Sequence, residues 1–136
     1  MPLALRLPLL LLSLLLLAAC SNIRSMEIDE RLFLRQRAFE NALHWGEYEL
    51  AATFRRPVEG SEPGPAPDDL KRFKVTEMVV RDSRVLEPER RIQVTSVIQY
   101  YAEETQRLET LNYSQIWVYE PEQREWYLES PLPELR

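Results

Sequence analysis

Hydrophobic and polar positions follow two different patterns along this chain, and the change between them separates a helical part from a β-rich part. Before residue 55, apolar side chains recur every three or four positions, a spacing that places them on one face of an α-helix. After residue 72, segments rich in β-branched and aromatic residues are separated by turn-forming residues. The order of the two patterns predicts helices followed by strands.

An amphipathic helix is predicted to begin near Ser25 and to end near Gly46. Serine is a favoured N-cap residue, and the acidic residues that follow it are stabilised by the positive end of the helix dipole. Glycine readily adopts the left-handed conformation that ends a helix. A second, shorter helix is predicted over residues 47–54. The apolar stripe of the first helix contains Ile28, Leu32, Phe39 and Leu43.

Four strands are predicted in the second half of the chain. The segments that precede the second and the fourth strand contain Pro88 and Pro121, and proline presets the backbone angle at the second position of a turn. Adjacent strands joined by short turns form an antiparallel meander, and helices are expected to cover one of its faces. The result is an α+β domain of two layers. The predicted strands span residues 73–86, 91–102, 107–119 and 125–130.

Two features interrupt the regular pattern. Residues 57–67 lack periodicity and are punctuated by prolines and glycines, so that this segment is predicted to be a mobile surface loop. Val79-Val80 and Tyr100-Tyr101 place apolar side chains on both phases of a strand, which indicates bulges or strong curvature. We therefore expect a curved sheet.

The first 19 residues have the composition of an export signal. They contain one charge, Arg6, followed by a leucine-rich run and by small residues at positions 18 and 19. These features are typical of a signal peptide that is removed from the mature protein. An uncleaved membrane helix needs about 20 consecutive apolar residues. The leucine-rich run is at that limit and is interrupted by Pro8, so residues 1–19 are predicted to be cleaved.

The sequence Leu17-Ala18-Ala19-Cys20 resembles the lipobox of bacterial lipoproteins. The resemblance implies that the thiol of Cys20 takes a diacylglyceryl group and that acyl chains such as palmitate anchor the protein in a membrane, with residues 20–26 as a short tether. Stable anchoring needs more than one chain, a condition that a mature lipoprotein meets. Ser21, in place of the aspartate that retains lipoproteins in the inner membrane, implies the inner leaflet of the outer membrane, facing the periplasm.

Composition limits the partners of the predicted mature chain. Removal of residues 1–19 leaves 117 residues and, because Arg6 is the only charge lost, changes the formal net charge of −5 to about −6. Such an acidic chain lacks the basic surface of a nucleic-acid-binding protein and gives little reason to expect attraction to anionic headgroups. One domain over residues 27–133 is expected.

The order of elements resembles the nuclear transport factor 2-like, cystatin-like superfamily of α+β proteins, especially small lipoproteins of that kind. The resemblance rests on residues 39–48, which join the two helices, and on the strand pair that contains Trp117 and Trp126. It implies a cone in which a curved sheet wraps a helix and encloses an apolar pocket. Some members are enzymes, such as ketosteroid isomerase, and others bind ligands, form dimers or act as assembly domains, so that the fold alone does not select an activity.

Candidate catalytic residues are few. His44 is the only histidine, so a multi-histidine metal site cannot form within one chain, and no cofactor motif is present. Glu77, Asp82 and His44 are candidate acid or base groups for an isomerase- or cyclase-like enzyme, although a surface or structural role is favoured for each.

The aromatic residues of the strands are the other candidates. Aromatic side chains bury a large apolar area and keep a polar atom for directional contacts. Core packing is the favoured role, and a pocket or binding face is the alternative. The candidates are Tyr100, Tyr113, Trp117 and Trp126.

Three functions remain open on these grounds. The leading hypothesis is a non-enzymatic, periplasm-facing lipoprotein that binds a protein partner or a small apolar ligand. The alternatives are an isomerase- or cyclase-like enzyme with an acid/base residue in an apolar pocket, and a component of outer-membrane assembly. A homodimer through the open sheet face is a further hypothesis, because the strands carry a surplus of apolar residues.

Overall fold

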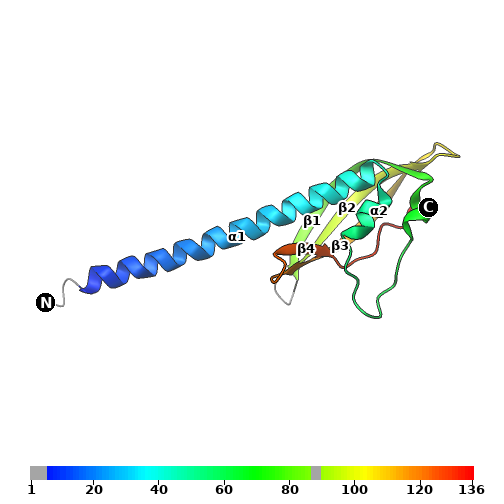
Figure 1. Cartoon of the computed structure of the whole chain (residues 1–136). Helices are drawn as coiled ribbons and strands as arrows, with labels where there is room; N and C mark the ends of the chain where they lie inside the picture. Colours follow the sequence, from blue (N-terminus) through cyan, green and yellow to red (C-terminus); the bar gives the residue numbers. More distant parts are fainter. Residues whose placement is uncertain (1–5, 87–89) are drawn as a thin grey trace.

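The computed structural model describes the backbone of residues 6–86 and 90–136, and the side chains of residues 11–13, 25–86 and 90–136. The described chain is an α+β domain in which helices precede an antiparallel sheet, as predicted (Figure 1). The helices are α1 (Arg6–His44), α2 (Tyr48–Thr53) and α3 (Pro67–Leu70). The strands are β1 (Phe73–Leu86), β2 (Arg91–Ala102), β3 (Leu108–Glu120) and β4 (Glu125–Leu128).

The sheet is a meander with the strand order β1-β2-β3-β4 and antiparallel pairing throughout. The predicted bounds of the first two strands agree with β1 and β2, and β3 is displaced by one residue from its predicted position. β4 ends at Leu128, two residues earlier than predicted. There the chain turns inward, and Ser130 Oγ accepts a hydrogen bond of 2.6 Å from the backbone N–H of Ile116.

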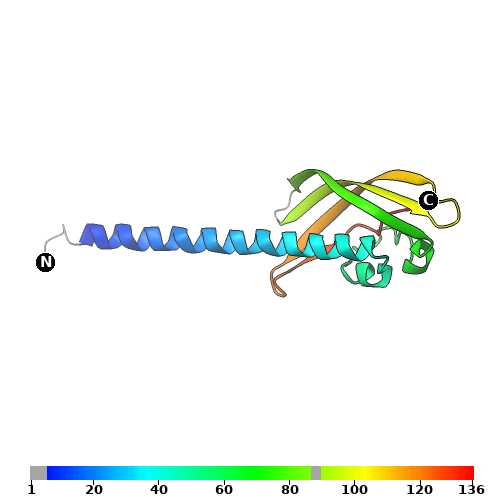
Figure 2. The same ribbon diagram turned by 90° about the horizontal axis from the view of Figure 1, so that it is seen from above.

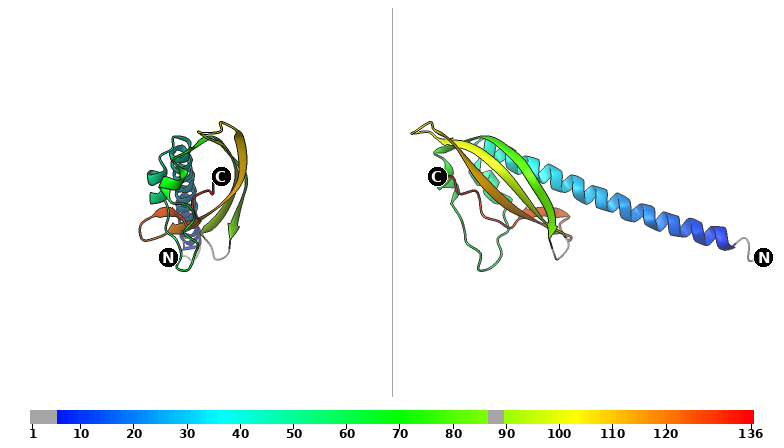
Figure 3. Two further views of the ribbon diagram at one scale, coloured as in Figure 1. Left: turned by 90° about the vertical axis from the view of Figure 1, so that its right-hand side faces the viewer. Right: turned by 180° about the vertical axis from the view of Figure 1, so that it is seen from behind.

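Curvature of the sheet arises in β1. Its register with β2 shifts between Val75 and Glu77 and again between Val80 and Asp82, and each inserted residue bends the strand and increases its twist. The second shift lies beside Val79-Val80, where the sequence predicts a bulge, whereas the pairing of β2 with β3 continues without a shift through Tyr101. The strands consequently curve around the C-terminal half of α1 and around α2 (Figures 2 and 3).

Helix α1 is much longer than the predicted amphipathic helix, since it begins at Arg6 and not near Ser25. Leucine and alanine are strong helix formers, and neither proline nor glycine occurs between Pro8 and Gly46 to end the helix. Pro8 falls in the first turn, where a missing backbone N–H costs little. The backbone of residues 20–26 is therefore helical, and the N-terminal half of α1 extends away from the sheet (Figure 1).

In the part of the chain that the structure describes, no helix has an apolar stretch of the length needed to cross a bilayer.

The core lies between α1 and the concave face of the sheet, with Phe39 at its centre. The Phe39 ring lies 5.7 Å from those of Phe54 and Trp117 and 6.4 Å from that of Tyr113. Alternate residues of β2 from Val94 to Ala102 are buried on the same face. Each fully buried side chain of this size contributes roughly 1.5–3 kcal/mol to folding, so this layer is the main source of stability.

The proline-rich segment of residues 57–67 is attached to the domain at its centre. Arg55 donates hydrogen bonds of 2.9 Å to the Pro63 carbonyl and 2.8 Å to the Ser130 carbonyl. Gly64 lies directly against Pro131. These contacts hold the middle of the predicted surface loop against the C-terminal segment.

Candidate functional site

The four aromatic side chains proposed for a pocket or interface lie in the core, and the polar atom of each is bonded within the protein. Tyr100 donates to the Arg136 carbonyl at 3.0 Å and Tyr113 donates to the Pro131 carbonyl at 2.8 Å. The indole of Trp117 donates to Gln115 Oε1 at 2.9 Å, and that of Trp126 to the Ile28 carbonyl at 3.0 Å. The exposed fraction of each of the four side chains is 6 % or less.

The candidate acid/base residues lie on the surface. Glu77 and Asp82 are exposed on β1, where Asp82 forms an ion pair of 3.2 Å with Arg84. His44 is exposed in the last turn of α1, and its ring lies 5.0 Å from that of Trp45. None of the three candidates lines a pocket described below. Among the described residues, no group of three histidine, cysteine, aspartate or glutamate side chains is placed to hold a metal ion.

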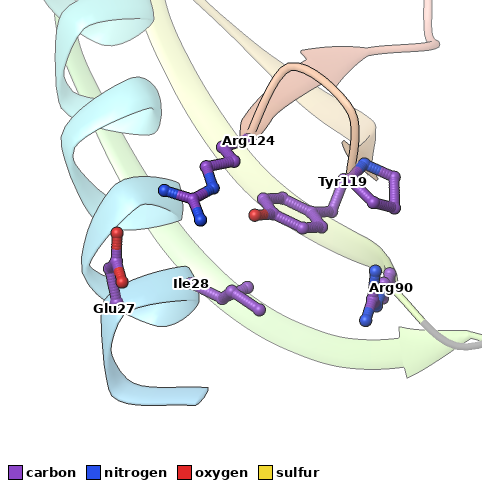
Figure 4. A pocket seen from close by; sticks show the side chains of 6 residues that line it. Glu27, Ile28, Arg90, Tyr119 and Arg124 are labelled. Carbon is purple, nitrogen blue, oxygen red and sulfur yellow. The ribbon is translucent and has the colours of Figure 1, made fainter. Parts of the chain in front are cut away.

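Several hollows mark the surface of the described domain. One of about 250 Å³ lies between the Val58 region and the outer face of β3 and β4, and one of about 680 Å³ lies between α3 and the C-terminus. Another, of about 210 Å³, is lined by residues at the end of the domain from which α1 projects (Figure 4). We call it the base pocket, and it is lined by Glu27, Ile28, Arg90, Tyr119, Pro121 and Arg124.

Hydrogen bonds hold the walls of the base pocket together. The Arg90 carbonyl accepts a hydrogen bond of 2.9 Å from the backbone N–H of Tyr119, which joins the start of β2 to the end of β3. Arg31 of α1 donates to the Arg124 carbonyl at 3.2 Å. The bond from Trp126 to the Ile28 carbonyl joins β4 to the same helix. Segments from four parts of the chain thereby keep fixed positions around the pocket.

Both arginines of the base pocket have left-handed backbone conformations, with φ of 68° at Arg90 and 52° at Arg124. Non-glycine residues adopt this region uncommonly, and each of the two arginines lies directly beside paired strand residues. Figure 4 shows the guanidinium group of Arg124 and the hydroxyl group of Tyr119 directed towards α1, with Ile28 below them. Arg90 Cζ lies 5.5 Å from the centre of the Tyr119 ring.

Two arginines and one glutamate are the charged side chains that line the base pocket, although the chain as a whole is acidic. Glu27 accepts hydrogen bonds of 3.3 and 3.2 Å from Arg31, which neutralises the carboxylate in the pocket wall. Arg90 and Arg124 form no ion pair with any residue that the structure describes. The guanidinium groups of Arg90 and Arg124 therefore have no carboxylate partner among the described residues.

Sequence reasoning missed the base pocket, but a signal for it was present. Glu87-Pro88-Glu89-Arg90-Arg91 and Glu120-Pro121-Glu122-Gln123-Arg124 share the pattern Glu-Pro-Glu-x-Arg. In an antiparallel meander the first and third turns lie at the same end of the sheet. The repeated pattern places Arg91 and Arg124 at one end of the sheet, and the pocket residue Arg90 precedes Arg91; residues 87–89 themselves lie outside the described residues.

The second candidate site is the exposed edge of the sheet. β1 pairs with β2 on one side, and no other strand of the described chain pairs with its second side. The opposite edge is covered by the segment that follows α2. Arg55 forms an isolated parallel β-bridge with Leu128, and the Leu128 backbone N–H donates a hydrogen bond of 2.8 Å to the Phe54 carbonyl. We call the exposed residues Glu77, Val80, Asp82, Arg84 and Val85 the β1 edge.

Two valines of the β1 edge point to the face of the sheet that elsewhere forms the core. Val80 pairs with Ser96, and Val85 pairs with Ile92; directly paired residues lie on the same face of a sheet. Ser96 is fully buried beneath the helices, yet Val80 is 54 % exposed and Val85 is 70 % exposed. The helices therefore leave this part of an apolar face uncovered.

Comparison of the chain with protein-family models, curated proteins and solved structures finds no match.

Proposed function

We propose that the protein is a membrane-anchored, periplasm-facing lipoprotein without enzymatic activity that binds another envelope protein along the β1 edge. The observation that carries this proposal is the exposure of Val80 and Val85 on the face of the sheet that is otherwise buried. Apolar surface left uncovered next to an unpaired strand favours association with another polypeptide.

The anchor is supported by the N-terminal sequence. Leu17-Ala18-Ala19-Cys20 follows an apolar run of leucines in the manner of a lipobox, and Cys20 is the proposed site of lipidation. The side chain of Cys20 lies outside the described residues. Anchorage in the inner leaflet of the outer membrane, inferred from Ser21, is part of the same proposal.

The cone of the nuclear transport factor 2-like superfamily is the proposed fold within the α+β class. A bent sheet that wraps α1 supports it (Figure 3). In this chain the inside of that curve is occupied by aromatic side chains, with Trp117 and Trp126 at most 1 % exposed. We therefore favour a protein partner on the exposed edge over a small apolar ligand inside the cone.

Site-specific photo-crosslinking in living cells tests the partner. A photo-reactive residue is placed at Val80 or Val85, and at Val58 as a control, because Val58 is 52 % exposed but lies in the proline-rich segment. We expect one discrete envelope protein to be crosslinked from positions 80 and 85 and not from 58. In a chain that also carries Val85→Glu, the yield from position 80 is expected to fall about tenfold, since burial of one valine contributes roughly 1.5–3 kcal/mol.

Two results would count against the proposed partner. Identical products from all three positions would mean that the β1 edge has no selectivity. A single product with twice the mass of the chain would identify a second copy as the occupant, in agreement with the homodimer hypothesis and against a different envelope protein. Thermal denaturation of each variant shows whether a lost product reflects unfolding.

A further inference from the structure

The base pocket combines three features that suit a phosphate group. Guanidinium groups form paired hydrogen bonds with phosphate oxygens and remain charged at any physiological pH. Arg90 and Arg124 reach the pocket from opposite sides, and the Tyr119 hydroxyl lies between α1 and the sheet (Figure 4). Ile28 and Pro121 add apolar wall. The lining therefore combines exposed charged groups with the half-buried side chains of Ile28 and Tyr119.

Three carboxylates near the base pocket form ion pairs with other arginines, whereas Glu122 is exposed in the turn that carries Arg124. Glu27 is paired with Arg31, Glu120 lies 3.8 Å from Arg56, and Glu125 lies 3.4 Å from Arg35. A phosphate entering the base pocket would meet two guanidinium groups that have no carboxylate partner among the described residues. The negative net charge of the whole chain argues against diffuse attraction to an anionic membrane. It does not exclude local binding of a phosphate group by Arg90 and Arg124.

The position of the pocket relative to the proposed anchor identifies the source of the phosphate. Ile28 follows Cys20 by eight residues within α1, which corresponds to about 12 Å along a helix axis. The headgroup layer of a bilayer is roughly 5–8 Å thick on each side of the hydrocarbon, and tilting of α1 shortens the distance further. A lipidated Cys20 would hold the base pocket beside the headgroups.

We propose that the base pocket binds the phosphate of a membrane phospholipid headgroup, with Arg90 and Arg124 as the binding cations and Tyr119 as a further hydrogen-bond donor. The proposal rests on the lipid anchor proposed above. Binding at this place would fix the orientation of the domain on the bilayer. The β1 edge, which runs away from the base along the sheet, would then be presented at a constant angle.

Trp126 provides a local probe of occupancy. Its indole N–H is bonded to the Ile28 carbonyl and its ring lies 5.3 Å from the Tyr119 ring. In the full chain carrying Cys20→Ser, held in non-ionic detergent micelles, the NMR signal of this N–H is followed during titration with phosphatidylglycerol. We expect a saturable shift that is absent with diacylglycerol of the same acyl chains, and that weakens as salt is raised.

Matched arginine variants identify the site. Arg90→Gln and Arg124→Gln are each expected to weaken binding about tenfold or more, because each removes charge-assisted hydrogen bonds to the phosphate. Arg107→Gln is the control, since Arg107 is exposed between β2 and β3 and makes the same change in net charge. Equal weakening by all three variants would indicate a general charge effect and overturn the proposal.

The remaining outcomes separate the possible ligands. If phosphatidylglycerol leaves the Trp126 signal unchanged, the base pocket does not bind a phospholipid and the inference is wrong. If inorganic phosphate produces the shift at equal or lower concentration, the ligand is free phosphate and the proposed lipid source is wrong. The Cys20→Ser chain carries no lipid of its own, so a titration without a shift contradicts the assignment of the base pocket as a phosphate site. Absence of lipid on Cys20 of the wild-type protein contradicts the proposed anchor instead.

Discussion

At the scale of single residues, buried tyrosines show how the core accommodates polar atoms. Tyr48 is 1 % exposed and its hydroxyl donates a hydrogen bond of 2.9 Å to the Phe73 carbonyl. Burial raises the pKa of Tyr48 to about 12, because the phenolate would lose its hydration. Burial also raises the pKa of Tyr113 above its usual range, against the opposing effect of Arg55. Both residues are therefore neutral in the folded protein at physiological pH.

Tyr48 should make the protein sensitive to alkali. Since its pKa is raised from 10 in the unfolded chain to about 12 in the folded one, the unfolded state loses its proton first and stability falls as pH rises from 10 to 12. One group with this shift removes about 2–3 kcal/mol over that interval. Tyr48→Phe should lower the free energy of unfolding at pH 7 by about 1 kcal/mol and reduce the alkaline loss.

Urea denaturation at pH 7, 9, 10 and 11 measures both effects, with the wild-type protein alongside the variant. Other tyrosines and the lysines titrate in both proteins, so the difference between the two curves isolates Tyr48. Parallel pH profiles for the two proteins would show that Tyr48 does not control the alkaline transition.

Two glycines of the proline-rich segment provide a test of its attachment. Gly60 and Gly64 have φ values of 81° and 68°, and alanine at either position costs roughly 1–2 kcal/mol. A Cβ at Gly64 would also overlap the Pro131 side chain, whereas a Cβ at Gly60 would meet nothing within 4 Å. Gly64→Ala should therefore be more destabilising than Gly60→Ala by about 1–3 kcal/mol. Equal melting temperatures for the two variants would contradict the contact with Pro131.

At the scale of elements, periodicity and turn residues predicted most of the fold. The bounds of β1 and β2 agree with those predicted from the sequence. In β2, buried and half-buried side chains alternate regularly, which is the pattern expected of a strand with one face in the core. Helix α1 begins before the predicted N-cap at Ser25, because the leucines that precede Ser25 are strong helix formers and continue the helix through it.

The candidate sites were harder to predict than the elements. The base pocket depends on contacts between Ile28 and residues more than 60 positions later in the chain, and sequence periodicity does not report such contacts. Exposure of Val80 and Val85 depends on where α1 stops covering the curved sheet. The four core aromatics were identified as apolar strand residues, but their hydrogen-bond partners, such as the Arg136 carbonyl for Tyr100, lie in segments without periodicity.

Two phenylalanines of α1 test which face of the helix packs on the sheet. Phe39 is fully buried and Phe33 is 60 % exposed. Phe39→Ala should lower the free energy of unfolding by about 3–5 kcal/mol, the usual cost of removing a buried aromatic side chain. Phe33→Ala should change it by about 0.5 kcal/mol or less. Chemical denaturation measures both values, and similar losses for the two variants would contradict the packing of α1.

At the scale of the whole molecule, α1 connects the proposed membrane anchor to the domain. It carries the chain from the Cys20 region to the core without interruption (Figure 1). The base pocket is lined by residues at the end of the domain from which this helix projects. The β1 edge lies along the outer strand of the sheet and reaches the base of the domain at Val85, which pairs with Ile92. With Cys20 in the bilayer, the Val85 end of the β1 edge would lie nearer the membrane than the Glu77 end.

Lipidation of Cys20 is the central claim, because orientation on the membrane, cellular location and access to envelope partners all depend on it. Mass spectrometry of the N-terminal peptide, from protein purified out of the membrane fraction, tests it most directly. We predict a peptide that begins at Cys20 and carries the mass of a diacylglyceryl group with an additional acyl chain. A peptide that begins at Met1, or an unmodified Cys20 in membrane-purified protein, would contradict the account.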